Sequence, residues 1–380
     1  MNWHKFYTCV GFYTKISSYI THSEKNSCSS IWYTEIARVS MTEIAVRKDD
    51  HIRINLEEDV RSGLTNGFEK YMFIHCALPE LDLSTIDTSK LVFAKVLQAP
   101  LLISSMTGGT AKAKEVNERL ARLAAELNIA MGVGSQRVSM GGSKRKTGFN
   151  VRKYAPDILL FANIGAVQLN YGYGLDECVK LVDEIGADGL FLHLNPLQEA
   201  LQPEGDTNFS GLLAKIEVLC ARLQSPVVVK EVGWGLSKKV TRSLLQAGVA
   251  GIDVAGAGGT SWSQVEMHRI TDPVKRRVES KFVNWGIPTA EAIANVGLKM
   301  RNKLLVASGG ISDGIEVAKA LALGADLCGL AGPFLRTAAE SESALQQFAA
   351  EIIQTLKVAM FATGSSDLAA LKRGKLEKIG

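Results

Sequence analysis

A short stretch of the chain carries several side chains suited to acid–base or ligand chemistry. Within seven residues stand an imidazole, two amides and a carboxylate: His193, Asn195, Gln198 and Glu199. They follow the apolar run 189–192, which predicts a buried strand, so the polar groups emerge where that strand ends. In parallel α/β barrels the active site lies at the carboxyl ends of the strands. We therefore predict that substrate and metal bind along this stretch, which continues to Asp206.

Two glycine clusters follow the last two predicted strands. One is the run 308–314, with Gly309 and Gly310, and the other is the run 329–333. Glycine lets backbone N–H groups approach an anion closely, and the dipole of a following helix favours negative charge. Tight turns alone would also explain either cluster. Because both clusters lie on adjacent strands, where barrels commonly bind phosphate, they favour a phosphate site.

The first three strands are followed by small residues, hydroxyls and amides, in the runs 104–109, 134–137 and 163–165. A flat ring system needs such a surface, with backbone against one face and amides on its polar edge. Lys230 ends the fifth strand, where a lysine either reaches solvent or faces an internal negative charge. Beside a flavin, this lysine would stabilise the anionic edge of the reduced ring.

Cationic side chains stand before the barrel and after one strand. Arg47, Lys48 and His51 precede the barrel, and a run of this kind ordinarily forms a solvated face. Arg137 follows a strand end and is better placed to bind an anion. Glu199 is a single carboxylate, so a metal cage built by protein alone is not expected. Mg²⁺ held by one carboxylate, waters and a diphosphate is typical of that ion.

The elements that must position these residues alternate along the chain. Apolar runs predict strands at 101–104, 129–134, 159–164, 189–193, 227–230, 251–255, 304–307 and 327–331. Amphipathic runs predict helices at 112–128, 176–185, 211–223, 236–246, 289–300, 313–323 and 334–356. In the first helix, Val116, Leu120, Leu123 and Leu127 form one apolar stripe. This order predicts an α/β fold, a closed (β/α)₈ TIM barrel, with an open doubly wound sheet as the alternative.

The remaining segments suggest a division of the chain. Residues 99–380 are predicted to form the barrel, and 41–98 an N-terminal cap of strands and loops that contributes to the substrate site. The polar insertion 259–286 is predicted to be a mobile lid. Residues 1–40 differ in composition and lack a secretory signal, so we expect a disordered extension or translated upstream sequence, with Met41 as the working start.

Composition excludes several classes of protein. The 380 residues carry a formal net charge of +4 with scattered bases, which gives no footprint for nucleic acid. No segment has the apolar length of a membrane span. The six cysteines show neither a CxxC pair nor metal-ligand spacing, and they are interpreted as reduced thiols. These features favour a cytoplasmic enzyme.

Together the motifs resemble one family, the type 2 isopentenyl-diphosphate delta-isomerases, which are FMN-dependent (β/α)₈ barrels. The resemblance runs from about Val46 to the C-terminus. Its most specific parts are the entry segment 47–51 and the motif 193–199. Less specific are the segments 105–109, 134–137, 230–233, 255–262, 308–310 and 331–332, since other FMN barrels share their glycines.

The resemblance implies which residues bind FMN, the substrate and Mg²⁺. It implies that FMN is bound by Ser105, Met106, Thr107, Ser135, Asn163, Lys230, Thr260, Gly309, Gly310, Ala331 and Gly332. It implies that the substrate diphosphate is held by Arg47, Lys48, Ser135 and Arg137, with His51, His193, Asn195 and Gln198 around the substrate. Glu199 would carry Mg²⁺. NADPH is the expected reductant of the flavin, and a homotetramer or homo-octamer is the expected assembly.

The implied reaction moves a double bond between isopentenyl and dimethylallyl diphosphate. One carbon gains a proton and another loses one, so a tertiary carbocation must be stabilised electrostatically. Reduced flavin supplies a π face for that purpose and an N5 for proton exchange, without net redox. Trp262 and Glu266 lie one helical turn apart and are predicted to close over the alkene, although a solvated face for Glu266 is equally compatible. Gln198 is predicted to relay or position a proton.

Three other functions use a similar barrel. A 2-hydroxy-acid oxidase needs a histidine with an arginine, and His268-Arg269 is the candidate pair. A dehydrogenase of the inosine-monophosphate type needs a cysteine after the sixth strand, and none lies between Cys220 and Cys328. A flavin-binding scaffold without activity would not need the diphosphate and metal positions.

Overall fold

The computed structural model describes residues 46–379, apart from 107, 109, 142–147 and 297–301. Residues 45–380 form one compact unit. The expectations about residues 1–40 and about Met41 lie outside the described residues. Within the described part, no helix combines the length and the apolar composition needed to cross a membrane.

Eight parallel strands close into a barrel, in the spatial order β10-β11-β4-β5-β6-β7-β8-β9. The strands are β4 (Leu101–Ile103), β5 (Ala130–Gly132), β6 (Leu160–Gly165), β7 (Gly189–His193), β8 (Val227–Lys230), β9 (Gly251–Asp253), β10 (Leu304–Ser308) and β11 (Leu327–Leu330). The last strand pairs with the first, through Gly329 opposite Leu102. The predicted (β/α)₈ barrel is confirmed, and the open sheet is excluded.

The strands are buried on both faces because side chains alternate between the barrel interior and the helix layer. In β4, Leu102 belongs to the interior cluster, whereas Leu101 and Ile103 pack under the helices. Phe161 of β6 and Phe191 of β7 stack inside the barrel with ring centroids 4.3 Å apart. Continuous apolar runs in the sequence are the consequence of this two-sided burial.

A hairpin packs on the interior cluster. It consists of β2 (Lys90–Val92) and β3 (Lys95–Leu97), whose Val92 and Leu97 are buried with the interior side chains. The hairpin turn places Phe93 and Ala94 at φ values of 45° and 65°. Phe93 also meets the ring of Phe161 edge-on. The segment before the barrel therefore contributes to the barrel core.

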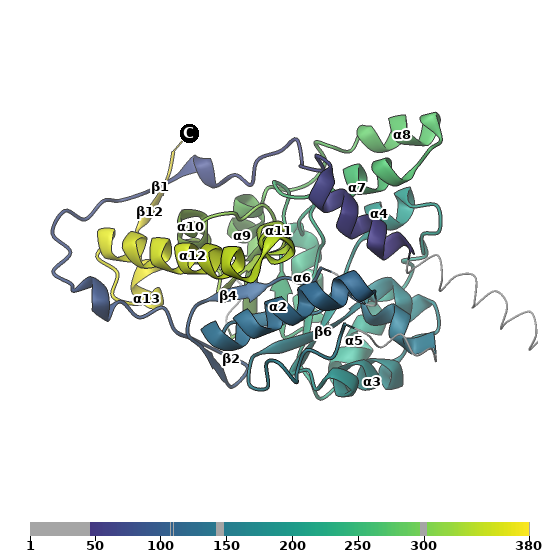
Figure 1. Ribbon diagram of the computed structural model, residues 1–380, viewed down its shortest axis with the longest axis horizontal. Helices are drawn as coiled ribbons and strands as arrows, with labels where there is room; N and C mark the ends of the chain where they lie inside the picture. The colour runs from purple at the N-terminus through teal and green to yellow at the C-terminus, as the bar shows by residue number, and fades with distance from the viewer. Residues whose placement is uncertain (1–45, 107, 109, 142–147, 297–301, 380) are drawn as a thin grey trace, which may run out of the picture. The chain divides into compact units, whose positions relative to one another are not determined.

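Helices surround the strands (Figure 1). They are α2 (Ala111–Leu127), α3 (Leu175–Ile185), α5 (Leu212–Arg222), α6 (Lys238–Gln246), α9 (Thr289–Val296), α10 (Gly314–Ala322), α11 (Gly332–Glu340), α12 (Glu342–Ala362) and α13 (Leu368–Leu371). The stripe predicted for α2 is confirmed, since Val116, Leu120 and Leu123 are buried. The single helix predicted at 334–356 is wrong. Ser341 is extended there, and its hydroxyl accepts the N–H of Ala344, so it ends α11 and caps α12.

The predicted cap of strands and loops needs a correction, because residues 46–57 form a helix. Ile52, Ile54 and Leu56 alternate with polar residues, which is a strand-like period of two. Tertiary contacts override it, since Ile54 packs with Val60 and Val265 in a small separate cluster. The cap also contains β1 (Tyr71–Phe73), which pairs antiparallel with β12 (Leu376–Lys378) near the C-terminus.

The insertion predicted as a lid folds into two helices, α7 (Trp262–Arg269) and α8 (Pro273–Ser280). Helix 46–57, drawn in purple, lies beside α7 and the short helix α4 (Pro196–Leu201) in Figure 1. Val265 and Glu266 on α7 are fully buried. A closing movement of this segment stays a prediction.

We expect Phe161→Ala to lower the free energy of unfolding by about 3 to 5 kcal/mol, because the removed ring leaves a cavity inside the barrel. Urea denaturation followed by circular dichroism measures the change. Val274→Ala serves as the control, since Val274 is 58% exposed and should change stability by less than about 0.5 kcal/mol. Equal effects of the two substitutions would contradict the assignment of Phe161 to the core.

Candidate active site

The carboxyl ends of the strands bring the predicted polar residues together at what we call the barrel mouth. His193 ends β7 and pairs in register with Gly165 of β6 and Lys230 of β8. Lys230 in turn lies opposite Asp253 of β9. The strand ends from Gly165 to Asp253 therefore lie side by side at the barrel mouth, although they are far apart in the sequence.

Lys230 faces an internal negative charge and does not reach solvent. Its Nζ lies 3.7 Å from Oδ2 of Asp253 and donates to the carbonyl oxygen of Glu231 at 2.6 Å. Burial raises the pKa of Asp253, while Lys230 and a hydrogen bond from Ser308 oppose that effect. The sequence did not single out Asp253, because one aspartate within an apolar strand is a weak signal.

His193 is a neutral imidazole at the mouth. Burial lowers its pKa to about 3, and the neighbouring cations Lys230 and Lys48 add to the effect. Its Nδ1 lies 2.8 Å from Oδ1 of Asn163, so Nδ1 carries the proton and Nε2 is left as an acceptor. A Cβ at Gly165 would stand 3.1 Å from that Nε2, so a glycine leaves the acceptor room.

The motif residues of α4 form a compact amide and carboxylate cluster. Nδ2 of Asn195 donates to Oε1 of Gln198 at 3.1 Å and to Oε1 of Glu199 at 2.9 Å. The other oxygen of Glu199 accepts from the side chain of Gln202 and from the backbone N–H of Asp206. Among the described residues, Oδ1 of Asn195 is buried without a hydrogen-bond partner.

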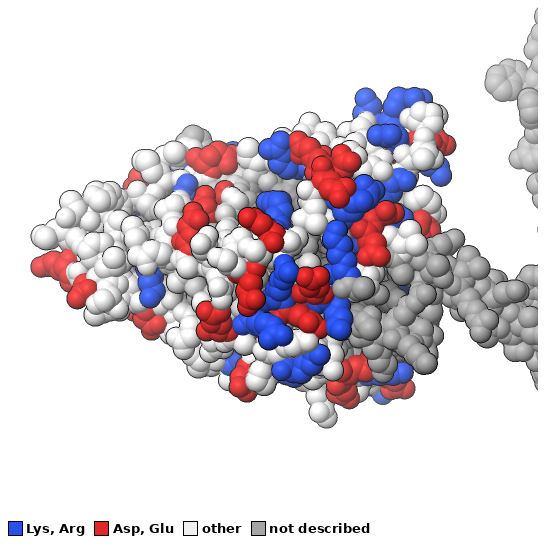
Figure 2. All heavy atoms as spheres, in the orientation of Figure 1, with Lys and Arg blue, Asp and Glu red and all other residues white. Residues whose placement is uncertain are grey.

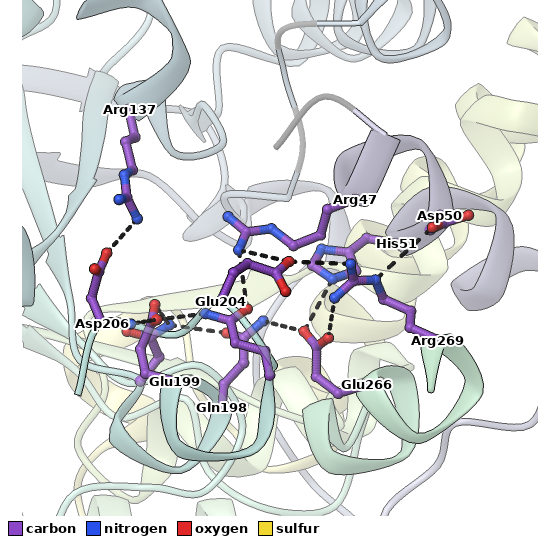
Figure 3. A network of polar contacts seen from close by, with 12 residues as sticks. Arg47, Asp50, His51, Arg137, Gln198, Glu199, Glu204, Asp206, Glu266 and Arg269 are labelled. Atoms are coloured by element: carbon purple, nitrogen blue, oxygen red, sulfur yellow. Dashed lines mark hydrogen bonds and ion pairs between the residues drawn. The ribbon is translucent and has the colours of Figure 1, made fainter. Parts of the chain in front are cut away.

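Glu266 lies at the centre of the network in Figure 3, and the solvated face considered for it is wrong. Its Oε1 accepts from Nε2 of His51 at 3.1 Å and from Nε2 of Gln198 at 3.0 Å. Its Oε2 accepts from Arg269 at 2.6 Å. Burial works to raise the pKa of Glu266, but these hydrogen bonds and the charge of Arg269 prevail and hold the pKa at about 2. The carboxylate is therefore ionised although it is fully buried.

Trp262 lies one turn before Glu266 on α7 and contacts the same histidine. The rings of Trp262 and His51 meet edge-on with centroids 5.0 Å apart. Burial lowers the pKa of His51, and the bond to Glu266 opposes the shift. Trp262, Glu266 and His51 therefore lie together, and the closing of Trp262 and Glu266 over an alkene stays a prediction.

Helix 46–57 carries its cations to the mouth, so the solvated face expected for this run is wrong. Lys48 donates to the carbonyl oxygens of Gly108 and Ser135, both at 2.8 Å. Burial, together with the charge of Arg47, lowers the pKa of Lys48 to about 7. The side chain of Arg47 is only 13% exposed. On the far side of the mouth, Arg137 pairs with Asp206.

The residues expected to hold FMN border the same mouth and fit such a group. Oγ of Ser105, after β4, is buried without a partner among the described residues. Gly309 and Gly310 have φ values of 104° and 74°, and a Cβ at Gly309 would lie 2.1 Å from the oxygen of Gly256. The rest of the set comprises Met106 and Ser135 after β4 and β5, Asn163 on β6, Lys230 on β8, Thr260 before α7, and Ala331 and Gly332 at the start of α11, while Thr107 lies outside the described residues.

A metal ion at the barrel mouth would be bound by one protein carboxylate, that of Glu199. No group of three or more histidine, cysteine, aspartate or glutamate side chains with metal-binding geometry occurs in the described part of the chain. Glu199 and the unpaired Oδ1 of Asn195 are oxygen donors of the kind that Mg²⁺ accepts beside a diphosphate. The donor set is compatible with that ion and does not suit a metal held by protein alone.

The pair His268-Arg269 is not arranged for an oxidase. Nδ1 of His268 faces Glu58 at 3.8 Å. Arg269 is engaged by Glu266 and Glu204, so its guanidinium is not free for a substrate carboxylate. Arg269 belongs instead to the network around Glu266, a role that the sequence did not reveal.

Figure 2 shows cations and carboxylates intermixed on the face that it displays, as expected from the scattered charges. At the carboxyl ends of the strands, by contrast, the structure brings together glycine turns, the unpaired hydroxyls of Ser104 and Ser105, and the buried Lys230. The closed parallel barrel defines the class of (β/α)₈ barrel proteins. A family model described as FMN-dependent dehydrogenase matches residues 197–378.

Solved structures of this class share the fold. The flavin-binding domain of baker's yeast flavocytochrome b2 superposes with a TM-score of 0.60 at 19% identity, covering 82% of this chain and 77% of that one. A mandelate oxidase variant gives 0.61 at 17% identity, covering 91% and 98%. At these identities the similarity establishes the architecture and no activity.

Comparison with curated relatives identifies the family within this class. Proteins named isopentenyl-diphosphate delta-isomerase from Nostoc sp. and Rickettsia bellii are 54% and 51% identical to the chain. The alignments cover 88% and 87% of this chain and 96% of each relative. The chain therefore belongs to the isopentenyl-diphosphate delta-isomerase family, of the FMN-dependent type.

We expect Glu266→Gln to lower the free energy of unfolding by about 3 kcal/mol at pH 7, because Arg269 loses a buried counter-ion. The pKa of Glu266 lies below its ordinary value of 4.5, so the ionised form stabilises the fold above pH 4.5 and this contribution disappears as the pH falls towards 2. Denaturation curves at several pH values measure the difference between the two proteins.

Glu58→Gln is the matched control, because Glu58 is exposed and its ion pair with His268 is long at 3.8 Å. It should change stability by less than about 0.5 kcal/mol. A difference between Glu266→Gln and the wild type that stays constant from pH 7 to pH 3 would contradict an ionised Glu266.

Proposed function

We propose that the chain interconverts isopentenyl diphosphate and dimethylallyl diphosphate by a 1,3-allylic proton shift, with reduced FMN and Mg²⁺. The observation that carries the proposal is the hydrogen-bonded cluster of Gln198, Glu266 and His51, beside the cations that helix 46–57 brings to the barrel mouth. A diphosphate needs the cations, and an alkene needs a proton-handling group beside an electron-rich surface. The mouth combines both, and the family supports the same substrate.

The diphosphate end would be held by cations that now have protein partners. Lys48 would exchange the carbonyl oxygens of Gly108 and Ser135 for phosphate oxygens. Its pKa of about 7 would rise beside that negative charge, so the ammonium would stay protonated. Arg47 and Arg137 would bind from two sides, with the hydroxyl of Ser135 nearby. Glu199 and Asn195 would hold Mg²⁺, which would offset the negative charge of the diphosphate.

The hydrocarbon end would lie against Trp262 and the amides of the α4 motif. Glu266 is anionic, so its Oε1 can receive a proton and its charge favours a nearby cationic carbon. Gln198 bridges Glu266 and Asn195 through its Nε2 and Oε1, and it would orient the carboxylate toward the substrate. His193 would offer the Nε2 lone pair as an acceptor and does not carry a proton at neutral pH.

FMN fits the rim, and when bound in its reduced form it would supply a π surface and an exchangeable proton without net redox. Lys230 would then balance negative charge on the ring edge, while Asp253 keeps the lysine oriented. NADPH as the reductant, a homotetramer or homo-octamer, a cytoplasmic location and the lack of nucleic-acid or membrane partners remain predictions from the sequence.

The direct test is anaerobic incubation of the purified protein with FMN, NADPH, Mg²⁺ and isopentenyl diphosphate, followed by product analysis. We expect dimethylallyl diphosphate, and we expect omission of NADPH or addition of a chelator to suppress it. Oxidation of lactate or glycolate without isomerisation would support the 2-hydroxy-acid oxidase instead. Protein that takes up no flavin would overturn the proposal.

Gln198→Ala should lower kcat by about a hundredfold or more, as expected when a group that positions a proton donor or acceptor is removed. FMN affinity, measured by fluorescence quenching, should be unchanged because Gln198 contacts α7 and not the glycine turns. Gln246→Ala, on the exposed side of α6, is the control and should keep full activity. Normal turnover of Gln198→Ala would remove Gln198 from the mechanism.

A further inference from the structure

The turn after α4 carries two carboxylates, Glu204 and Asp206, to which the proposed function assigns no role. Each contacts one of the arginines proposed to hold the diphosphate. Arg137 lies 2.5 Å from Asp206, and Arg47 lies 3.6 Å from Glu204 and 3.2 Å from the side chain of Gln202. Figure 3 shows Arg137 extending to Asp206 and, further along the network, Arg47 beside Glu204. Both guanidinium groups are therefore neutralised by the chain itself.

The backbone, not the arginines, holds the two carboxylates in place. The N–H of Gly205 donates to the oxygen of Gln202, and the N–H of Asp206 donates to Glu199 at 2.7 Å. The turn packs so closely on α4 that a Cβ at Gly205 would lie 1.8 Å from the backbone oxygen of Glu199. Since the turn is fixed and arginine side chains are long, an exchange of partners would move the guanidinium ends.

Each carboxylate also has a second donor that would remain after such an exchange. Gln168 donates to Oδ2 of Asp206 at 3.1 Å, and Arg269 donates to Oε1 of Glu204 at 3.3 Å. Neither carboxylate would be left without a partner when its arginine turns to a ligand. An exchange therefore avoids the large cost of an unpaired buried charge.

We propose that Glu204 and Asp206 are exchangeable counter-ions that make the site selective for diphosphate over monophosphate. In the free protein, each carboxylate binds one arginine and keeps Arg47 and Arg137 apart. Both arginines leave their carboxylates only when one ligand carries enough negative charge to bind both of them. A monophosphate, with a charge of about −2, replaces one carboxylate at most. A diphosphate spans both arginines. The inference rests on the proposed function, because it takes the same arginines as diphosphate ligands.

The three carboxylates around this turn also explain why Mg²⁺ would be needed. Glu199, Glu204 and Asp206 repel an incoming anion, and a divalent cation at Glu199 would offset that repulsion. Glu204 and Asp206 act through the arginines and are positioning residues. Their removal should change anion affinity and its Mg²⁺ dependence, and it should leave the proton transfer itself alone.

The test uses the flavin-loaded protein and titration calorimetry with inorganic phosphate and inorganic diphosphate, each with and without Mg²⁺. Glu204→Gln and Asp206→Asn keep the shape and an acceptor oxygen for Arg269 and Gln168. Each should tighten phosphate binding by about threefold to fivefold, the range for a partly exposed ion pair. Diphosphate binding should gain less, so the discrimination falls, and the benefit of Mg²⁺ should shrink.

Asp59→Asn is the matched control, because Asp59 forms an exposed pair with Arg61 at 2.7 Å and its loss changes the net charge equally. It should leave both affinities unchanged. In isomerase assays the two test variants should shift KM for isopentenyl diphosphate and keep kcat. Circular dichroism verifies folding, and Glu204→Gln alone decides the question if Asp206→Asn does not fold.

Phosphate affinity that falls or stays constant in the variants would overturn the proposal, since the carboxylates would then only orient the arginines. A wild type that binds neither anion would overturn it as well. Absence of isomerisation with normal anion binding would overturn the proposed function and leave the selectivity result standing.

Discussion

One buried charge organises the candidate site. Glu266 is fully buried and ionised, and an isolated carboxylate in that position would cost several kcal/mol. Its partners His51, Gln198 and Arg269 come from the entry helix 46–57, from α4 and from α7. Arg269 shares α7 with Glu266, so it is His51 and Gln198 that link this carboxylate of the insertion to the entry helix and to α4.

The rest of the mouth follows the same rule of paired charges. Lys230 is balanced by Asp253, and Arg137 by Asp206. His193 lies near several cations, and its lowered pKa keeps the imidazole neutral, so it adds no positive charge to the mouth. The cations of the mouth are thus bonded to protein oxygens, and the site carries no uncompensated charge. Under the proposed function, diphosphate binding is an exchange of these partners within a preorganised frame.

The architecture could be predicted because parallel barrels impose strong local patterns. Each strand is buried on both faces, so it appears as an apolar run, and glycine turns mark the carboxyl ends of β10 and β11. The predictions failed where tertiary contacts oppose a local pattern. Ile52, Ile54 and Leu56 suggest a strand, yet packing on α7 makes a helix, and Ser341 divides a run that is amphipathic throughout.

The sequence by itself determined the barrel, the family and the types of group that line the mouth, since strand periodicity and contiguous motifs are local properties. Only the tertiary structure decided which charges meet. The roles of Glu204, Asp206, Asp253 and Arg269 come from the partners that the fold brings to them, up to 219 residues away for Asp50 and Arg269. Pairing across such separations depends on how helices dock, and no local pattern encodes it.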